Sequence, residues 1–206
     1  MTSAAREFSP PAPLRVVAPA EGADLARAEQ AAAAFLAALG VATDAGATAG
    51  TPRRMARAYA EMLSPRSFDL TTFANYEGYE ELVLARGIPV HSVCEHHMLP
   101  FLGTAHVGYL PGARILGLSK LARVVELFAR RPQVQERLTK QIADWLDAHL
   151  HPKGIGVVIE AEHLCMTLRG VRAAGATTMT SSLTGTLRSD PSSRAEFFTL
   201  AGLGSR

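Results

Sequence analysis

Three residues, Cys94, His97 and Cys165, have side chains that bind transition metals, and they include both cysteines of the chain. Cys94 opens the motif Cys-Glu-His-His, which lies where a strand-like pattern breaks into a turn. A cysteine and a histidine three residues apart in a turn can direct sulfur and nitrogen at one ion, and zinc accepts such ligands tetrahedrally at about 2.0–2.3 Å. This pair alone is half a site, and the ordinary alternative is a buried thiol beside two surface histidines.

The second cysteine makes a metal site the better interpretation. Along a strand through residues 160–169, alternation would place His163, Cys165 and Arg169 on one face and apolar residues on the other. Free cysteines are usually buried, so a cysteine on the polar face is unusual. Three protein ligands leave one tetrahedral position open, which is typical of catalytic rather than structural zinc. Another histidine could still close the site, but the pattern favours catalysis.

Two further histidines, His96 and His163, flank the expected ligands. The unperturbed pKa of imidazole lies near neutrality, which suits proton transfer in catalysis. The alternative is that they support the metal ligands or lie at the surface. The other histidines have no such neighbours in the sequence, and we expect them to be structural or exposed: His91, His106, His149 and His151.

Several cations could bind an anionic substrate. Lys120 and Arg123 follow Ser119 near the first turn of an expected helix, where amide groups and the helix dipole favour phosphate. Arg169 shares a face with the expected metal residues, and Arg54 lies in the first turn of another helix. Each alone is most simply a solvated surface charge, but together they could neutralise a triphosphate.

Gln135 and Glu136 stand at the start of the helix expected after Pro132. A glutamate there often only complements the helix dipole. The sharper hypothesis is a carboxylate that accepts two hydrogen bonds from the edge of a guanine base.

The elements that would position these residues are short and change type along the chain. Asp24 is a possible N-cap of the first helix, and Gly40 would end it. Helices are expected at 25–39, from Thr51, from Ser119, after Pro132 and from Ser192, and strands at 83–93, 104–110, 155–168 and 176–187. After the N-terminal helices the order is β-β-α-α-β-β, which predicts an α+β unit with helices on one sheet face. We expect a flexible tail over 1–22, a helical segment over 23–63 and a catalytic domain over 64–206.

Composition excludes several classes of protein. The chain has 206 residues, of which 48% are hydrophobic, and a net charge of +2, so it can bury one core but has no charge excess for binding nucleic acid. No apolar run is long enough to cross a membrane, and the first residues lack the pattern of a signal peptide. Two cysteines are too few for a disulfide framework, so we expect a reduced, cytoplasmic location.

The chain resembles the GTP cyclohydrolase I family. The matching segments are HSVCEHHMLPFLG at 91–103, ILGLSKLARVVELFARRPQVQERLT at 115–139, EAEHLCMTLRGV at 160–171, TMTSS at 178–182 and, more weakly, TPRRMA at 51–56. The resemblance implies zinc ligands Cys94, His97 and Cys165, and catalytic histidines His96 and His163. It also implies guanine recognition by Glu136 and Gln135, and triphosphate binding by Ser119, Lys120, Arg123, Arg169 and Arg54.

The same resemblance implies a fold and a reaction. The fold would be the tunnelling fold, whose β-β-α-α-β-β subunits join their sheets into a barrel, assembled as a homodecamer of two pentamers. The reaction would be zinc-dependent hydrolysis and rearrangement of GTP to 7,8-dihydroneopterin triphosphate and formate, at the entry to tetrahydrofolate and pterin synthesis. The stretch VATDAGATAG before Thr51 and Ala176 depart from the family pattern, but neither touches an expected metal ligand.

Two other functions stay open from the residues alone. One is an enzyme of the same fold that acts on GTP but stops at a ring-opened formamide. The other is a non-catalytic, zinc-stabilised subunit that binds nucleotides or regulates a partner. The presence of both His96 and His163 argues against the second, since a binding protein needs no proton donor.

Overall fold

The structure is a computed structural model that describes residues 14–16, 22–44 and 46–204. Its helices are α1 (Leu25–Ala38), α2 (Thr51–Met62), α3 (Ser119–Ala129), α4 (Gln135–Leu150), α5 (Leu164–Thr167), α6 (Gly185–Ser189) and α7 (Pro191–Leu200), with a 3-10 turn η1 (Gly46–Thr48). Its strands are β1 (Leu14–Val16), β2 (Phe68–Leu70), β3 (Thr72–Ala74), β4 (Val83–Cys94), β5 (Pro100–Leu110), β6 (Arg114–Leu116), β7 (Pro132–Gln133), β8 (Gly154–His163) and β9 (Thr177–Leu183).

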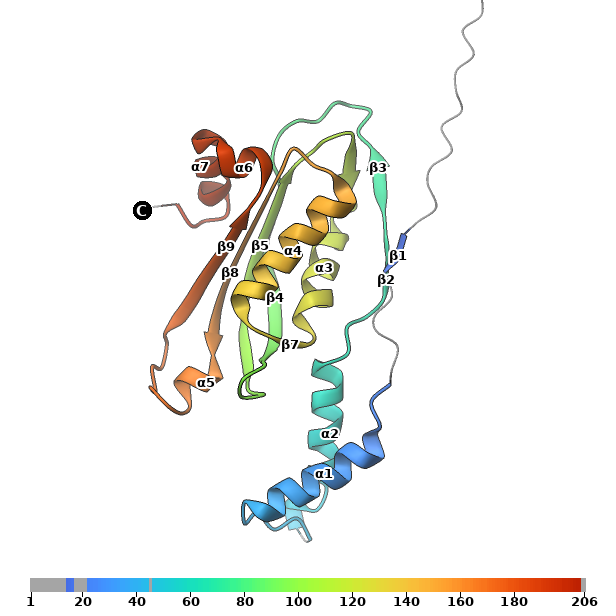
Figure 1. Cartoon of the computed structure of the whole chain (residues 1–206), viewed down its shortest axis with the longest axis vertical. Helices are drawn as coiled ribbons and strands as arrows, with labels where there is room; N and C mark the ends of the chain where they lie inside the picture. The colour runs from blue at the N-terminus through green and yellow to red at the C-terminus, as the bar shows by residue number, and fades with distance from the viewer. Residues whose placement is uncertain (1–13, 17–21, 45, 205–206) are drawn as a thin grey trace, which may run out of the picture.

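A five-stranded sheet in the order β7-β4-β5-β8-β9 forms the centre of the molecule (Figure 1). Its long strands are antiparallel, and the two-residue strand β7 pairs parallel to the end of β4. Two small two-stranded sheets, β1-β2 and β3-β6, lie outside it. The chain is therefore α+β, and the predicted order β-β-α-α-β-β is present with three short elements added: β6 before α3, β7 between α3 and α4, and α5 between β8 and β9.

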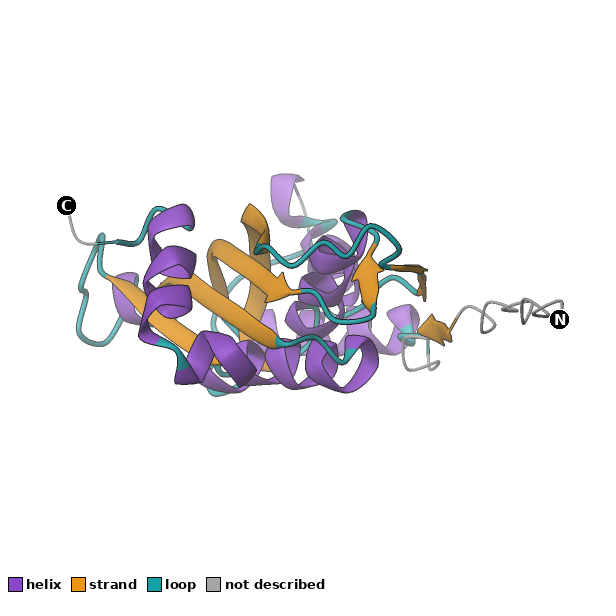
Figure 2. Cartoon of the chain, turned by 90° about the horizontal axis from the view of Figure 1, so that it is seen from above, coloured by secondary structure: helices purple, strands orange, loops and turns teal. Residues whose placement is uncertain are grey.

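Helices α3 and α4 pack on one face of this sheet, as Figures 1 and 2 show together. Their apolar stripes meet alternate residues of the strands, because successive side chains of a strand point to opposite faces. The fully buried residues of this core include Val90, Phe101, Ala105, Val107, Leu121, Val124, Leu138, Ile142, Ile155, Val157 and Ile159. The core thus holds both helices rigidly against the strands that carry the expected site.

The opposite face of the sheet is only partly covered. Near one end, Val158, Leu187 and Phe197 form a second apolar cluster under α6 and α7. Gly156 permits this packing, since a Cβ there would lie 2.8 Å from the Phe197 ring. Further along the same face Leu102 and Met179 are about half exposed, at 47% and 53%.

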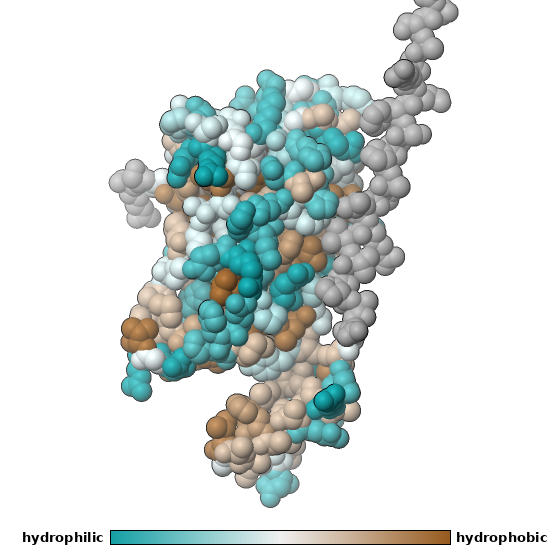
Figure 3. All heavy atoms as spheres, viewed as in Figure 1, coloured by the Kyte–Doolittle hydropathy of each residue, from teal (hydrophilic) through white to brown (hydrophobic). Residues whose placement is uncertain are grey.

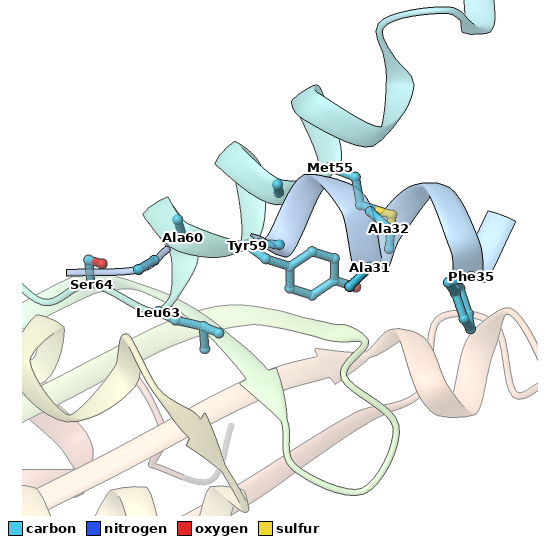
Figure 4. A pocket seen from close by; sticks show the side chains of 11 residues that line it. Ala31, Ala32, Phe35, Met55, Tyr59, Ala60, Leu63 and Ser64 are labelled. Carbon is cyan, nitrogen blue, oxygen red and sulfur yellow. The ribbon is translucent and has the colours of Figure 1, made fainter. Parts of the chain in front are cut away.

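Helices α1 and α2 pair and extend beyond the end of the sheet at which β4 turns into β5 (Figure 1). Asp24 caps α1 by accepting a hydrogen bond from the Arg27 amide, and Gly40 follows the helix with a φ of +76°, as predicted. Apolar side chains remain exposed on α1, including Phe35, and the lower part of Figure 3 is accordingly brown. A groove of about 550 Å³ runs between the two helices, lined by residues such as Phe35, Met55 and Tyr59 (Figure 4).

Several predicted boundaries were wrong. The strand predicted to reach Leu168 ends at His163, where α5 begins. In contrast, the helices expected from Thr51 and from Ser119 do begin at these residues, with Gly50 and Leu118 as their N-caps. Pro132 begins the short strand β7, which pairs with the end of β4, and the helix expected after it starts at Gln135.

Part of the segment predicted to be a flexible tail is structured. Residues 14–16 form β1 and pair with β2, whereas the other residues of that segment, except Gly22, lie outside the described part of the chain. Among the described helices, none combines the length and apolar character that crossing a bilayer would need.

Candidate functional site

The turn between β4 and β5 shapes the first half of the site. Cys94 is the last residue of β4, and its amide donates to the Leu99 carbonyl at 2.8 Å. The amides of His97 and Met98 donate back to the Cys94 carbonyl at 3.3 and 2.8 Å. Met98 adopts a φ of +53°, uncommon for a residue with a side chain, and its carbonyl accepts from the Tyr59 hydroxyl at 2.9 Å. Helix α2 thus helps to fix this turn.

The second half comes from the end of β8. The β5–β8 register places His163 opposite Phe101, so that α5 begins beside the β4–β5 turn. Cys165 lies on this short helix, not on a strand, and the strand alternation predicted for His163, Cys165 and Arg169 was therefore wrong. Cys165 nevertheless lies close to Cys94, since α5 begins beside the β4–β5 turn.

The possible ligand atoms of Cys94, His97 and Cys165 all lie within 4.8 Å of one another. The Cys94 sulfur lies 3.8 Å from Nδ1 of His97. In a tetrahedral zinc site with ordinary bond lengths, ligand atoms are separated by about 3.5–3.8 Å. Two sulfurs and one imidazole nitrogen at this spacing fit zinc after small side-chain movements, and they leave a fourth position for another molecule.

The two thiols influence each other. Burial raises the pKa of Cys165, and the neighbouring Cys94 raises it further. Only thiolates bind a metal, so a cation would have to overcome both effects by stabilising the negative charge. The pair is therefore a poor arrangement for two free thiols and a suitable one for a divalent cation.

His163 is held on two sides. Its ring stacks on Phe101 with centroids 4.6 Å apart and planes 12° from parallel, and its Nε2 lies 2.7 Å from Oε1 of Gln135. Burial lowers the pKa of His163, while the negative charge of Glu136 opposes this shift. The ring is thus fixed in place next to Cys165, with a carboxylate nearby.

Gln135 and Glu136 differ sharply in their surroundings. The Gln135 side chain is 2% exposed and is engaged by His163, β8 and β9, so that it is directed into the protein. Glu136 is exposed on the first turn of α4. Of the two residues expected to read guanine, Glu136 is the one whose side chain is free to meet a ligand.

His96 lies on the open side of the turn. Its Nδ1 is 3.9 Å from the Cys94 sulfur, and its Nε2 is 3.9 Å from a carboxylate oxygen of Glu95. Glu95 forms an ion pair with Arg137, and this contact holds the pKa of Glu95 below its ordinary value. Arg137 also donates to Gln133 at 3.0 Å, which ties the turn to the start of α4.

Comparison with known proteins decides the family. The family model described as GTP cyclohydrolase I matches residues 28–202. The chain belongs to the GTP cyclohydrolase I family. GTP cyclohydrolase 1 of Aquifex aeolicus is 49% identical over 86% of this chain and 96% of its own length. GTP cyclohydrolase 1 of Mycobacteroides abscessus is 53% identical over 86% of this chain and 89% of its own.

The family predicted from the motifs is thereby confirmed, and with it the prediction that the chain is an enzyme of this type. Among solved structures, the apo form of the archaeosine synthase QueF-Like aligns with a TM-score of 0.41 and 18% identity. That alignment covers 50% of this chain and 93% of the other, and the likeness is too slight to carry an argument.

The cations expected to bind triphosphate do not all gather at the site of this GTP cyclohydrolase I chain. The far end of α3 is near it, since Ser92 donates to the Ala129 carbonyl at 2.6 Å. Ser119 and Lys120 lie at the other end of this 11-residue helix, about 15 Å away. Arg169, in contrast, lies near the site, since its positive charge acts to lower the pKa of Cys165.

The other two expected cations are engaged elsewhere. Arg123 donates to Glu126 at 3.3 Å. Arg54 donates to the Ala47 carbonyl and the Thr51 hydroxyl, both at 2.9 Å, near the outer end of α2. Within one chain, the possible metal ligands and most of the expected phosphate ligands are therefore separate.

Sequence reasoning missed the residues that support the site. Phe101, Thr139 and Thr180 have no chemistry of their own, and they become visible only when β5, α4 and β9 meet around His163 and Gln135. A signal did exist for Thr180, because it lies in the TMTSS segment that resembles the family.

Proposed function

We propose that this protein converts GTP to 7,8-dihydroneopterin triphosphate and formate, the first step of pterin and tetrahydrofolate synthesis. The observation that carries the proposal is the convergence of Cys94, His97 and Cys165 beside a fixed His163. Relatives of 49% and 53% identity that bear the name GTP cyclohydrolase 1 support the same substrate here. Both thiols must stay reduced to bind a metal, so a cytoplasmic location is part of the proposal.

Zinc is the metal that the donor set favours, and Cys94, His97 and Cys165 would hold it. When bound, zinc supplies a Lewis acid that makes water a competent nucleophile near neutral pH.

The histidines would then move protons. His163, fixed by Phe101 and Gln135, would protonate N7 of guanine as the imidazole ring of the base opens. Burial lowers its pKa, so it would give up that proton readily, and the nearby Glu136 limits the effect. His96, whose side chain is 64% exposed, would exchange protons with solvent in the later steps.

Glu136 would select guanine. A carboxylate can accept from both N1–H and the 2-amino group of guanine, whereas adenine offers neither donor. A site built on such paired hydrogen bonds discriminates strongly because the wrong base leaves a polar group unmatched. Glu136→Ala should weaken GTP binding without loss of zinc. Unchanged GTP affinity and preference over ATP would reduce Glu136 to a residue that complements the helix dipole.

The active site would be completed by neighbouring subunits in a decamer of two pentamers built on the tunnelling fold. Two observations support this assembly. Among the described residues, no strand pairs with the outer edge of β9, and the outer edge of β4 is paired only at its end by β7, so that sheet-to-sheet pairing would cover both. Lys120 and Arg54 lie away from the metal ligands of their own chain and would serve a neighbour's site.

Assembly can be tested by mass and by complementation. Light scattering should give about ten times the 21.9 kDa chain. Co-expression of an inactive Cys165→Ala chain with an inactive Lys120→Ala chain should restore partial activity, because some mixed sites would carry both intact residues. A fully active monomer, or confirmed mixed oligomers without rescue, would place each site within one chain.

The deciding experiment for the function uses the zinc-loaded protein with GTP. Formate release and pterin fluorescence after oxidation should rise together, in a ratio of one to one. Formate without a pterin, or a ring-opened formamide without formate, would show that the reaction stops early. GTP binding with no product would identify a binding protein and overturn the proposal.

A further inference from the structure

A closed set of hydrogen bonds joins the first turn of α4 to β8, β9 and His163. Its centre is the side-chain amide of Gln135, which is 2% exposed. The amide nitrogen lies 3.0 Å from the Ile159 carbonyl, 2.9 Å from the Thr178 carbonyl and 3.1 Å from the Thr180 hydroxyl. The amide oxygen lies 2.7 Å from Nε2 of His163.

This environment fixes the orientation of the Gln135 amide. Nitrogen and oxygen of an amide are assigned from their hydrogen-bond partners. The carbonyls of Ile159 and Thr178 can only accept, so the amide nitrogen must face them. The reverse orientation would set the amide oxygen against the two carbonyl oxygens of Ile159 and Thr178 in a buried place, which is costly.

The hydroxyl groups around Gln135 fix the rest of the network. Thr139 donates its one hydroxyl hydrogen to the Gln135 carbonyl at 2.8 Å. The 2.6 Å contact between the Thr139 and Thr180 hydroxyls must then use the hydrogen of Thr180. The Thr180 oxygen is then left to accept, and it shares the two amide hydrogens of Gln135 with the carbonyls of Ile159 and Thr178. Each bond therefore has one possible direction.

The direction of the last bond determines the tautomer of His163. An amide oxygen cannot donate, so Nε2 of His163 must carry the hydrogen, whether the ring is neutral or charged. We propose that Gln135 is a positioning residue, oriented by Thr180 and Thr139, that keeps the hydrogen of His163 on Nε2 and leaves Nδ1 as the nitrogen that meets the substrate.

The stack on Phe101 supports the same arrangement. With ring planes 12° apart and centroids at 4.6 Å, the imidazole of His163 keeps one plane, and the Gln135 contact fixes its rotation within that plane. The role assigned to Nδ1 rests on the proposed function, because it assumes that His163 acts in catalysis. The tautomer itself does not depend on any reaction.

The tautomer can be measured in the zinc-loaded protein without turnover. Magic-angle-spinning NMR of protein labelled with [15N]histidine distinguishes Nε2–H from Nδ1–H rings, and the His163→Asn variant identifies the signal of His163. We expect a single Nε2–H tautomer in the wild-type protein. A hydrogen on Nδ1, or a mixture of both forms, would overturn the proposal whatever the enzyme does with GTP.

Variants test whether Gln135 is responsible. In Gln135→Met the acceptor is lost, so the Nδ1–H form should appear beside the Nε2–H form, and kcat should fall about 10- to 100-fold with KM for GTP nearly unchanged. A raised KM with an unchanged tautomer would instead make Gln135 a guanine contact and refute the positioning role. Thr180→Val should lower kcat in the same way, and Thr180→Ser, which keeps the hydroxyl, should restore it relative to Thr180→Val.

Failure of this inference can be told from failure of the proposed function. If wild-type protein releases no formate from GTP, the function is wrong even when His163 shows the expected tautomer. If formate is released normally and Gln135→Met changes neither tautomer nor kcat, the function stands and the positioning role falls.

Discussion

Gly103 is the position where adding one methyl group should separate the two halves of the site. It lies on β5 opposite Ala161 of β8, two residues from the Phe101–His163 pair. A Cβ there would clash with the carbonyl oxygen of Glu160 and lie 2.6 Å from the Ala161 Cα. Because ordinary carbon contacts begin near 3.4 Å, relieving the Ala161 contact alone would part the strands by about 0.8 Å, and the clash with the Glu160 oxygen requires more. The obstacle is backbone, so no side chain can turn aside to relieve it.

The expected loss of stability in Gly103→Ala follows from this clash. Overpacking a core costs about 1–3 kcal/mol, and a backbone obstacle places Gly103→Ala near the upper end. For a domain of this size that corresponds to a Tm lower by roughly 6–12 °C. Parting β5 from β8 also moves Cys165 relative to Cys94. Metal sites tolerate only about 0.2 Å in ligand distance, so zinc content should fall below that of the wild type.

The assay is thermal unfolding at one protein concentration and one scan rate, together with zinc analysis of the same samples. Gly22→Ala is the matched control, because a Cβ at Gly22 meets nothing within 4 Å. It should keep the wild-type Tm and zinc content. A Gly103→Ala protein with wild-type Tm and full zinc would show that β5 and β8 adjust easily, and the reasoning from this contact would be refuted.

Three further predictions concern single side chains. Cys165→Ser should lose zinc and ring opening together, and full activity in a sample with measured zinc would remove Cys165 from the ligand set. His163→Ala should keep its zinc yet turn over GTP about 100-fold more slowly, the usual scale of lost acid–base catalysis, whereas loss of zinc would make His163 a ligand. Burial raises the pKa of Glu126, but the hydrogen bond and charge of Arg66, with Arg130 and Arg123, outweigh it and hold that pKa below its ordinary 4.5. A lowered pKa means that ionised Glu126 stabilises the fold above pH 4.5 and that this stabilisation disappears as pH falls through the folded-state pKa. The stability difference between wild type and Glu126→Gln, measured by denaturant titration, should therefore be present at pH 7 and shrink below pH 4.5, and a difference independent of pH would contradict the charge argument.

The fold class could be predicted because the spacing of apolar residues and the residues that begin and end each element indicate the same elements along most of the chain. The apolar spacing of α3 and the caps around α1, with Asp24 before it and Gly40 after it, all act locally. The grouping of Cys94, His97 and Cys165 was predictable for another reason, since only two cysteines exist and one lies next to two histidines. Both kinds of signal can be read without knowing the tertiary structure.

The boundary at His163 could not be predicted in this way. Residues 160–168 alternate as a strand should, yet β8 ends at His163 and α5 follows. β9 begins only at Thr177, opposite Glu162, so residues beyond His163 have no strand to pair with on that side. Tertiary pairing, not local pattern, decides where this strand stops.

The start of α4 shows how neighbouring residues acquire different roles. Consecutive residues of an α-helix point about 100° apart, so Gln135 and Glu136 cannot face the same surroundings. The core decides which one turns inward, because Thr139, one turn later, is buried at 1% exposure and contacts Thr180 on β9. Gln135 shares that face and meets His163 from inside the protein, while Glu136 faces the side on which a ligand can arrive. One helix end thus supplies both the residue proposed to orient His163 and the residue proposed to recognise the base.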